Sequence, residues 1–101
     1  MYKRLGEYNR AKELLEKALT IRETFFGEDH AHVAISYNYL ASVYNSLGEY
    51  DQAKQLHEKA LMIFKKIFDE ENAYVARSYN NLASVYNSLG EYNRALSLIH
   101  I

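Results

Sequence analysis

Apolar residues recur at intervals of three and four along nearly the whole chain, which is the pattern of amphipathic helices. The first stripe consists of Tyr8, Ala11, Leu14, Leu15, Ala18, Leu19 and Phe25. It predicts a helix over Glu7–Phe26, which ends at the polar break Gly27–His30. A second stripe of the same period predicts an antiparallel partner helix over Ala31–Leu47.

This pair of stripes then begins again, with a period of 42 residues. The segment that begins at Leu5 matches the segment that begins at Leu47 at 27 of 42 positions, and a third copy begins at Leu89. Further helices are predicted over Glu49–Phe68, Asn72–Leu89 and from Glu91 onward. A fixed period in this range indicates a solenoid, in which each unit buries its apolar face by stacking on the next. The expected fold class is all-α.

Glycines are predicted to separate the helices. Their positions also indicate which part of a repeat each end of the chain belongs to. Gly6, Gly48 and Gly90 are each predicted to lie just past a helix end, where a positive φ closes the last turn. Met1–Leu5 would then be the last turn of a helix whose front is missing, as in an excerpt from a longer array. At the other end, Ser97–Ile101 places apolar residues on a face that is polar in the first copy. We expect truncation or foreign sequence there, or a face that packs on something missing.

Composition narrows the classes of function. The net charge is −1 and the charges are interspersed, so no basic stripe predicts nucleic-acid binding. No apolar run approaches the roughly 20 residues of a membrane span, and the polar start of the chain does not resemble a secretory signal. The chain has no cysteine, which excludes disulfides and thiolate chemistry. The expected compartment is the cytoplasm.

No constellation of polar residues predicts catalysis. Glu28, Asp29, His30 and His32 could in principle bind a metal, but the matched turn in the next copy has lost both histidines. We therefore predict a solvated turn with a helix-capping Asp or Asn, and no metal. His57 replaces a leucine on a mostly apolar face, which predicts a half-buried structural histidine. The chain is expected to have no catalytic residue, no cofactor and no enzymatic activity.

A polar row recurs on the second helix of each copy, beside the core stripe. Its members are Asn38, Ser42 and Asn45 in one copy and Arg77, Asn80, Ser84 and Asn87 in the next. Spacings of three and four residues place each set on one helix face. An Asn amide offers both a donor and an acceptor to a peptide backbone. The row could also be solvated filler, although Glu, Lys or Gln would be better helix formers. Arg77 stands where the first copy has Ile35, which favours an acidic segment.

The repeated positions resemble those of a known family. The residues that carry the resemblance are Tyr37, Leu40, Ala41, Tyr44, Gly48, Tyr50, Ala53, Ala60 and Leu61, and the pattern is similar to the tetratricopeptide repeat. The 42-residue unit and its Gly27–His30 turn resemble the kinesin light chain and related scaffold arrays. In that register, residues 1–26 are the tail of a first repeat with its second helix, 31–68 a full repeat, and 73–101 most of a third. The family usually has Pro near the turn, where this chain has Ala31 and Ala73.

The resemblance implies a right-handed α-solenoid of antiparallel helix pairs and a non-catalytic role in protein–protein interaction. The polar row would line a concave groove that receives an extended peptide segment of a partner protein. An alternative is a structural spacer or self-associating scaffold segment of a larger motor-adaptor or signalling protein, in which uncapped ends stack. Leu98, Ile99 and Ile101 favour such self-association. A further alternative is a parent enzyme that uses the array for regulation.

Overall fold

The computed structural model describes residues 2–90 of the chain, and within this range it is entirely helical without strands. The elements are α1 (Tyr2–Phe26), α2 (Ala31–Ser46), α3 (Tyr50–Ile67) and α4 (Ala73–Ser88). The predicted all-α class is confirmed, and α2, α3 and α4 lie within a few residues of their predicted ranges. The helix predicted from Glu91 onward and the segment Ser97–Ile101 lie outside the described residues.

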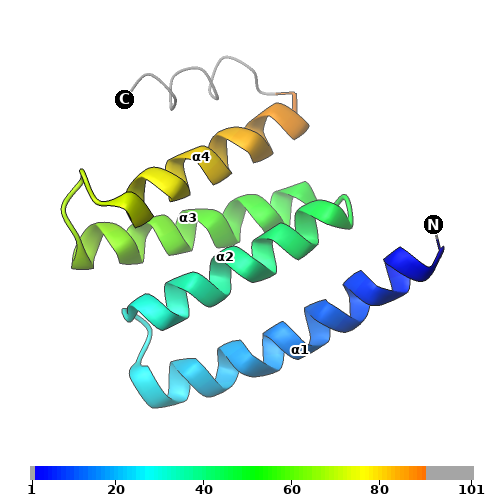
Figure 1. Cartoon of the computed structure of the whole chain (residues 1–101), viewed down its shortest axis with the longest axis horizontal. Coiled ribbons are helices and arrows are strands. Elements are labelled where there is room, and N and C mark those ends of the chain that lie inside the picture. The colour runs from blue at the N-terminus through cyan, green and yellow to red at the C-terminus, as the bar shows by residue number, and fades with distance from the viewer. Residues whose placement is uncertain (1, 91–101) are drawn as a thin grey trace.

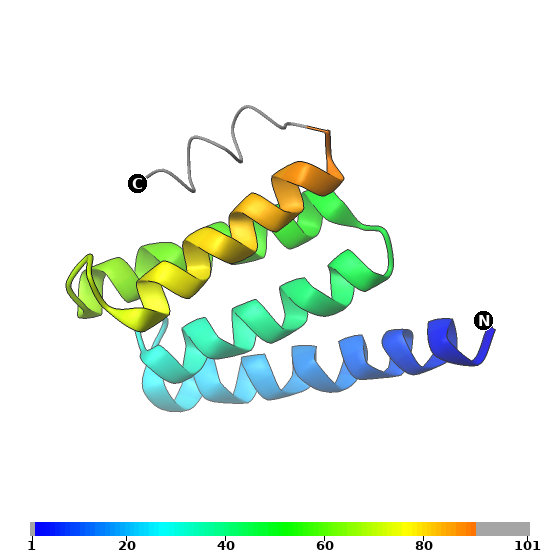
Figure 2. The ribbon, with the colours of Figure 1, turned by 45° about the horizontal axis from the view of Figure 1, so that its top comes forward.

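Each helix packs on its neighbours in the sequence: α1 on α2, α2 on α3, and α3 on α4. Consecutive helices run antiparallel, and they lie side by side in two views (Figure 1, Figure 2). The shortest extent of the molecule is only 17 Å. Such a thin array has no single central core, so its stability is the sum of contacts between successive helices.

The turn between α2 and α3 shows why glycine is required there. Gly48 has a φ of 81°, and the amide of Glu49 reaches back to donate to the carbonyl of Tyr44 at 2.9 Å. Only a residue without a Cβ adopts this left-handed conformation freely, so the helix closes and reverses at that point. Gly90 repeats the conformation after α4, as predicted.

Gly6 behaves differently, and the prediction that a helix ends before it is wrong. α1 runs unbroken from Tyr2 through Gly6 to Phe26. At Gly48 the reversal is supported by two helices that pack against each other. At Gly6 the backbone hydrogen bonds continue through the glycine, because propagating a helix is easier than starting another.

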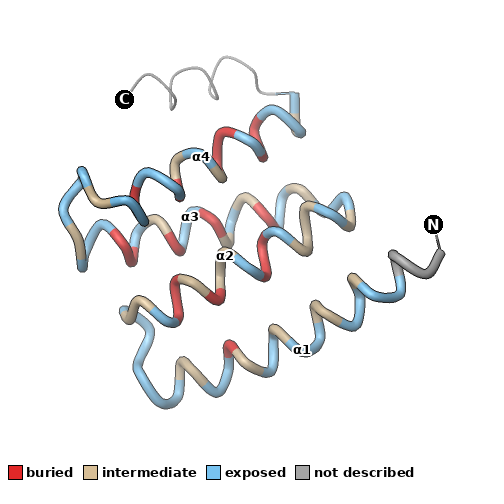
Figure 3. The backbone as a smooth tube through the Cα atoms, in the orientation of Figure 1, coloured by how far each residue is buried: buried red, intermediate tan, exposed pale blue. Residues whose placement is uncertain are grey.

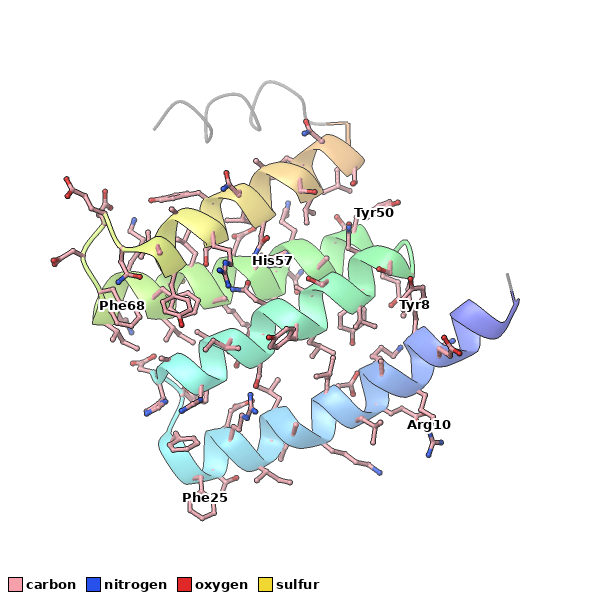
Figure 4. All side chains as sticks on the ribbon, in the orientation of Figure 1. Tyr8, Arg10, Phe25, Tyr50, His57 and Phe68 are labelled. Carbon is pink, nitrogen blue, oxygen red and sulfur yellow. The ribbon has the colours of Figure 1, made fainter. Side chains whose placement is uncertain are left out.

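Buried residues are concentrated on α2, α3 and α4 (Figure 3). The main cluster comprises Leu19, Val33, Ala34, Leu40, Ala60, Ile63, Phe64 and Val75. Of the described side chains of α1, only Leu19 is buried, and Phe25 points away from the other helices (Figure 4). Matched positions show the cause: Ile21 on α1 is 62% exposed, whereas Ile63 on α3 is 6% exposed. α3 has a helix packed on each side and α1 has only one.

The first turn is capped by a residue that the sequence did not single out for this role. His30, and not Asp29, caps α2, because its Nδ1 accepts a hydrogen bond from the amide of His32 at 3.1 Å. The His30 ring also stacks on Phe26 at a centroid distance of 4.4 Å. The predicted capping residue is therefore wrong in this turn. In the second turn it is confirmed, since Asn72 Oδ1 accepts from the amide of Tyr74 at 2.8 Å.

Candidate functional site

A cleft of about 290 Å³ lies between α2 and α4 and has a residue of α3 at its base. Its lining residues are Ile35, Asn38, Tyr39 and Ser42 of α2, Phe64 of α3, and Tyr74, Arg77 and Asn81 of α4. Spacings of three and four residues place each helix's contribution on one face. α2 and α4 occupy matched positions in two successive copies of the repeat, so the cleft lies between those copies.

Aromatic rings form the apolar part of the cleft. Phe64 is fully buried and stacks on Tyr74 at a centroid distance of 5.3 Å, with the ring planes 17° apart. Phe68 packs on both rings from the end of α3. On the opposite wall, the Tyr39 side chain is exposed. The fixed rings of α3 and α4 therefore face a free ring of α2, and an apolar side chain between them would lose its contact with water.

The polar part of the cleft is rich in hydrogen-bond donors and carries positive charge. The guanidinium of Arg77 lies 5.9 Å from the Tyr74 ring centroid, within range of a cation–π contact. No Asp or Glu lines the cleft. The Ser42 hydroxyl donates to the backbone carbonyl of Asn38 at 3.1 Å, so it stays close to its own helix and leaves room in the cleft.

Asn38 is joined to α3 by a hydrogen bond with a buried histidine. Its Oδ1 lies 2.7 Å from His57 Nδ1. His57 is only 3% exposed, and burial lowers the pKa of its imidazole from 6.5 to about 4. His57 lies in the middle of α3, between the helices that flank it (Figure 4). The predicted half-buried histidine is thus almost completely buried, because α3 is covered from two sides.

The predicted polar row divides into two groups. Asn38, Ser42 and Arg77 line the cleft, whereas Asn45, Asn80, Ser84 and Asn87 do not. The side chains of Asn80, Ser84 and Asn87 are exposed elsewhere on α4. Asn45 is partly buried, and its Oδ1 has no hydrogen-bond partner in the described part of the chain. For these four residues, contact with a partner remains a prediction.

Sequence reasoning missed Tyr39, Phe64, Tyr74 and Asn81. It looked for positions that recur in both copies, but these residues stand where the copies differ: Tyr39 matches Asn81, and Phe64 matches Arg22. Among the lining residues, only Asn38 and Ser42 have the same residue type at the matched position of the other copy. A search for variation at positions near the repeated Asn would have found the rest of the cleft.

A second cleft, of about 250 Å³, shares no lining residue with the first. It is lined by Glu28, Asp29, Tyr37, Lys59, Met62, Ile63 and Lys66. Its charges are largely matched within the protein, because Lys66 pairs with Asp29 at 3.2 Å and Lys59 lies over the Tyr37 ring. Burial, followed by the charges of Glu23 and Glu28, raises the pKa of the Tyr37 hydroxyl. Unlike the first cleft, this one is lined by two carboxylates, those of Glu28 and Asp29.

Other kinds of site find no support in residues 2–90. No group of three or more His, Cys, Asp or Glu side chains in this range is arranged to hold a metal ion. The described helices also include none that is both long and apolar enough to cross a membrane. The cleft between α2 and α4 is therefore the arrangement to compare with known proteins.

The model of the family described as tetratricopeptide repeat matches residues 1–66 and 32–99. No curated protein matches the sequence. The crystal structure of BtubC (BKLC) from P. vanneervenii superimposes with a TM-score of 0.87 and 30% identity, over 98% of this chain and 40% of that one. A putative kinesin light chain of Podosopora anserina with nearly identical TPR-like repeats gives 0.82 and 27%, over 98% and 47%. The chain spans less than half the length of both proteins.

Proposed function

Because the chain belongs to the tetratricopeptide repeat family, whose members generally bind other proteins, we propose that it holds an extended segment of a partner protein in the cleft between α2 and α4. The role is non-catalytic. The observation that carries the proposal is the lining of the cleft, which combines an aromatic wall with amide and guanidinium donors and contains no carboxylate. These features fit a peptide backbone with an apolar side chain and an acidic one.

An extended peptide would use the two kinds of surface in turn. Successive side chains of an extended segment point to opposite sides, so one can enter between Tyr39 and Tyr74 while the next points away. The amides of Asn38 and Asn81 lie on opposite walls, within reach of the backbone groups between these side chains. This arrangement recognises backbone and shape more than a fixed sequence.

Arg77 supplies the preference for acidic segments. It forms no salt bridge with any described residue, and its guanidinium lies over the Tyr74 ring. A guanidinium that lies over a ring and has no carboxylate partner can donate two parallel hydrogen bonds to a carboxylate of the ligand. The interface is small, so we expect modest affinity that weakens as salt is added.

Peptide selection followed by mutation tests the proposal. Peptides are selected from a random library against the wild-type chain, and their dissociation constants are measured by fluorescence anisotropy. Asn81→Ala is expected to weaken binding about five- to tenfold, the effect of one or two lost hydrogen bonds. Arg77→Ala is expected to weaken binding and to flatten its salt dependence. The control is Asn9→Ala, an exposed Asn on α1 outside the cleft. Equal affinities for Asn81→Ala and Asn9→Ala would contradict the proposal.

A specific observation also favours stacking on further helices of the same kind. The outer face of α1 exposes Leu14, Ile21 and Phe25, whereas the matched Leu56 and Ile63 on α3 pack within the clusters of the array. We propose that a helix resembling α2 covers this face of α1, from a further repeat or a second copy. Sedimentation should show association that grows with concentration and is lost in Ile21→Lys. A wild-type chain that stays monomeric at all concentrations would exclude the second copy.

A further inference from the structure

The contact between Asn38 and His57 fixes which atom of the Asn38 amide is free. A carboxamide oxygen only accepts hydrogen bonds, so Nδ1 of the His57 ring must be the donor in the 2.7 Å contact. In a neutral ring the proton is then on Nδ1 and not on Nε2. Nδ2 of Asn38 donates to no described residue, although Asn38 lines the cleft.

The orientation of the Asn38 amide and the tautomer of His57 depend on each other. His57 is 3% exposed and lies on a helix packed on both sides, so its ring has little room to rotate. Turning the Asn38 amide over would place its NH₂ group against the Nδ1–H of His57. Two donors at that distance repel each other, and both would lose their partner, which is costly for a buried group. As long as the ring proton is on Nδ1, Asn38 therefore has one stable orientation, whereas an exposed Asn has two.

We propose that His57 is a positioning residue that makes Asn38 a one-way hydrogen-bond donor in the cleft. Nδ2 donates to a carbonyl or carboxylate oxygen of the bound peptide, while Oδ1 is turned towards His57. The inference rests on the proposed function and adds the direction of one hydrogen bond, which runs from Asn38 to the peptide. It also separates two roles, since His57 acts through Asn38 and does not itself touch the peptide.

The arrangement is specific to the middle repeat. The residues that match His57 are Leu15 in the preceding copy and Ile99 in the following one, and neither side chain can form a hydrogen bond. Asn80, which matches Asn38, has no histidine partner among the described residues. The duplicated Asn residues therefore differ in function, because only Asn38 has its amide orientation set by a neighbour.

The tautomer of His57 tests the direction of its hydrogen bond with Asn38, and this measurement needs no peptide. Nitrogen-15 NMR of the full chain at neutral pH should show a protonated Nδ1 and a bare Nε2 for His57. The opposite tautomer would overturn the inference, because Nδ1 would then accept a hydrogen bond from Asn38 Nδ2. In that case Oδ1, an acceptor, would face the cleft. His30 provides a comparison signal, since its Nδ1 accepts a hydrogen bond from the backbone amide of His32.

Binding of the selected peptide tests the positioning role. His57→Leu introduces the residue that the preceding copy has at this position, so circular dichroism should show a folded chain. We expect a loss of affinity of about five- to tenfold, equal to that of Asn38→Ala. The double variant should lose no more than either single variant, because both remove the same contact. His57→Asn should recover most of the affinity, since its Nδ2 occupies the place of Nδ1.

The outcomes separate the inference from the proposed function. If Asn81→Ala weakens binding and His57→Leu does not, the inference is wrong and the proposed function stands. If the losses of His57→Leu and Asn38→Ala add, His57 acts by another route and the inference is again wrong. If no cleft variant weakens binding, both are wrong. Should His57→Leu fail to fold, the tautomer and the His57→Asn variant still decide.

Discussion

The two helix pairs α1–α2 and α3–α4 have the same backbone plan, yet they differ in the side chain that packs near a matched buried serine. In the first pair, Arg22 donates from Nη1 to the hydroxyl of the buried Ser36 at 2.6 Å. In the second pair, Phe64 stands at the position of Arg22, and the hydroxyl of the matched Ser78 has no partner in residues 2–90. The second pair thus lacks this hydrogen bond and has instead the aromatic base of the cleft.

The turns differ in a parallel way. In the first turn, His30 stacks on both Phe26 and His32 near the surface. In the second turn, Phe68 and Tyr74 stack on Phe64, which lies in the core. Since the helices are equivalent, the difference lies in side chains that the repeat pattern does not fix. The comparison shows that the duplicated backbone supports the array, while the positions that diverged carry the candidate site.

Phe64→Ala should have the largest effect on stability among the variants at matched positions. It removes a buried ring that supports both the core and the cleft, and we expect the free energy of unfolding to fall by about 3–5 kcal/mol. Arg22→Ala, the matched control, should cost about 1–3 kcal/mol, because it removes one charged hydrogen bond at a partly buried site. Urea unfolding measures both values. Similar losses for the two variants would contradict the different roles assigned to the matched positions.

Acid should destabilise the chain through His57. The residue at the matched position of the other copy, Leu15, does not titrate. The pKa of His57 is about 4 in the folded protein and about 6.5 when the chain is unfolded. Between these values the unfolded chain binds a proton that the folded chain does not, so stability falls as the pH is lowered from 6.5 towards 4. Over this range the titration of His57 lowers the free energy of unfolding by about 3 kcal/mol.

Urea unfolding as a function of pH checks this prediction, with His57→Leu as the matched variant. The variant should lack this part of the pH dependence, because leucine does not titrate. A variant whose stability falls as steeply as that of the wild type between pH 6.5 and 4 would show that other groups are responsible.

The two buried serines should respond in opposite directions when each is changed to Ala. Ser36→Ala leaves Arg22 without its partner, and we expect a loss of about 1–2 kcal/mol. Ser78→Ala removes a buried hydroxyl that makes no hydrogen bond with the described residues, so stability should stay the same or rise by up to about 1 kcal/mol. Thermal melts of both variants are sufficient. A loss of stability in Ser78→Ala would mean that its hydroxyl is satisfied after all.

The smallest effects are expected at the helix caps. Asn72→Ala should cost about 1 kcal/mol, because the amide of Tyr74 loses its acceptor. His30→Asn should change stability by no more than about 0.5 kcal/mol, since Asn can accept the same hydrogen bond as the His30 ring. Differential scanning calorimetry resolves this pair. A large loss in His30→Asn would indicate that ring stacking on Phe26, and not capping, is what His30 contributes.

The sequence predicted most of the fold because helices and their stacking depend on local periodicity that recurs every 42 residues. It failed at Gly6, because the matched Gly48 ends a helix whereas α1 continues through Gly6, and the glycine alone does not distinguish the two. At the cleft it found Asn38 and Ser42, which recur. It could not find Tyr74 or Phe64, because their role depends on ring packing between α3 and α4, and periodicity marks them only as ordinary helix residues.

The central claim, that a partner's peptide lies between α2 and α4, is tested most directly by photocrosslinking. p-Benzoylphenylalanine is placed at Tyr39, which lines this cleft and is 60% exposed, or at Met62, which lines the second cleft and is 62% exposed. The equal exposure makes the two positions a matched pair. We predict that the selected peptide crosslinks at position 39 and not at position 62. A crosslink at position 62 without one at position 39 would contradict the account.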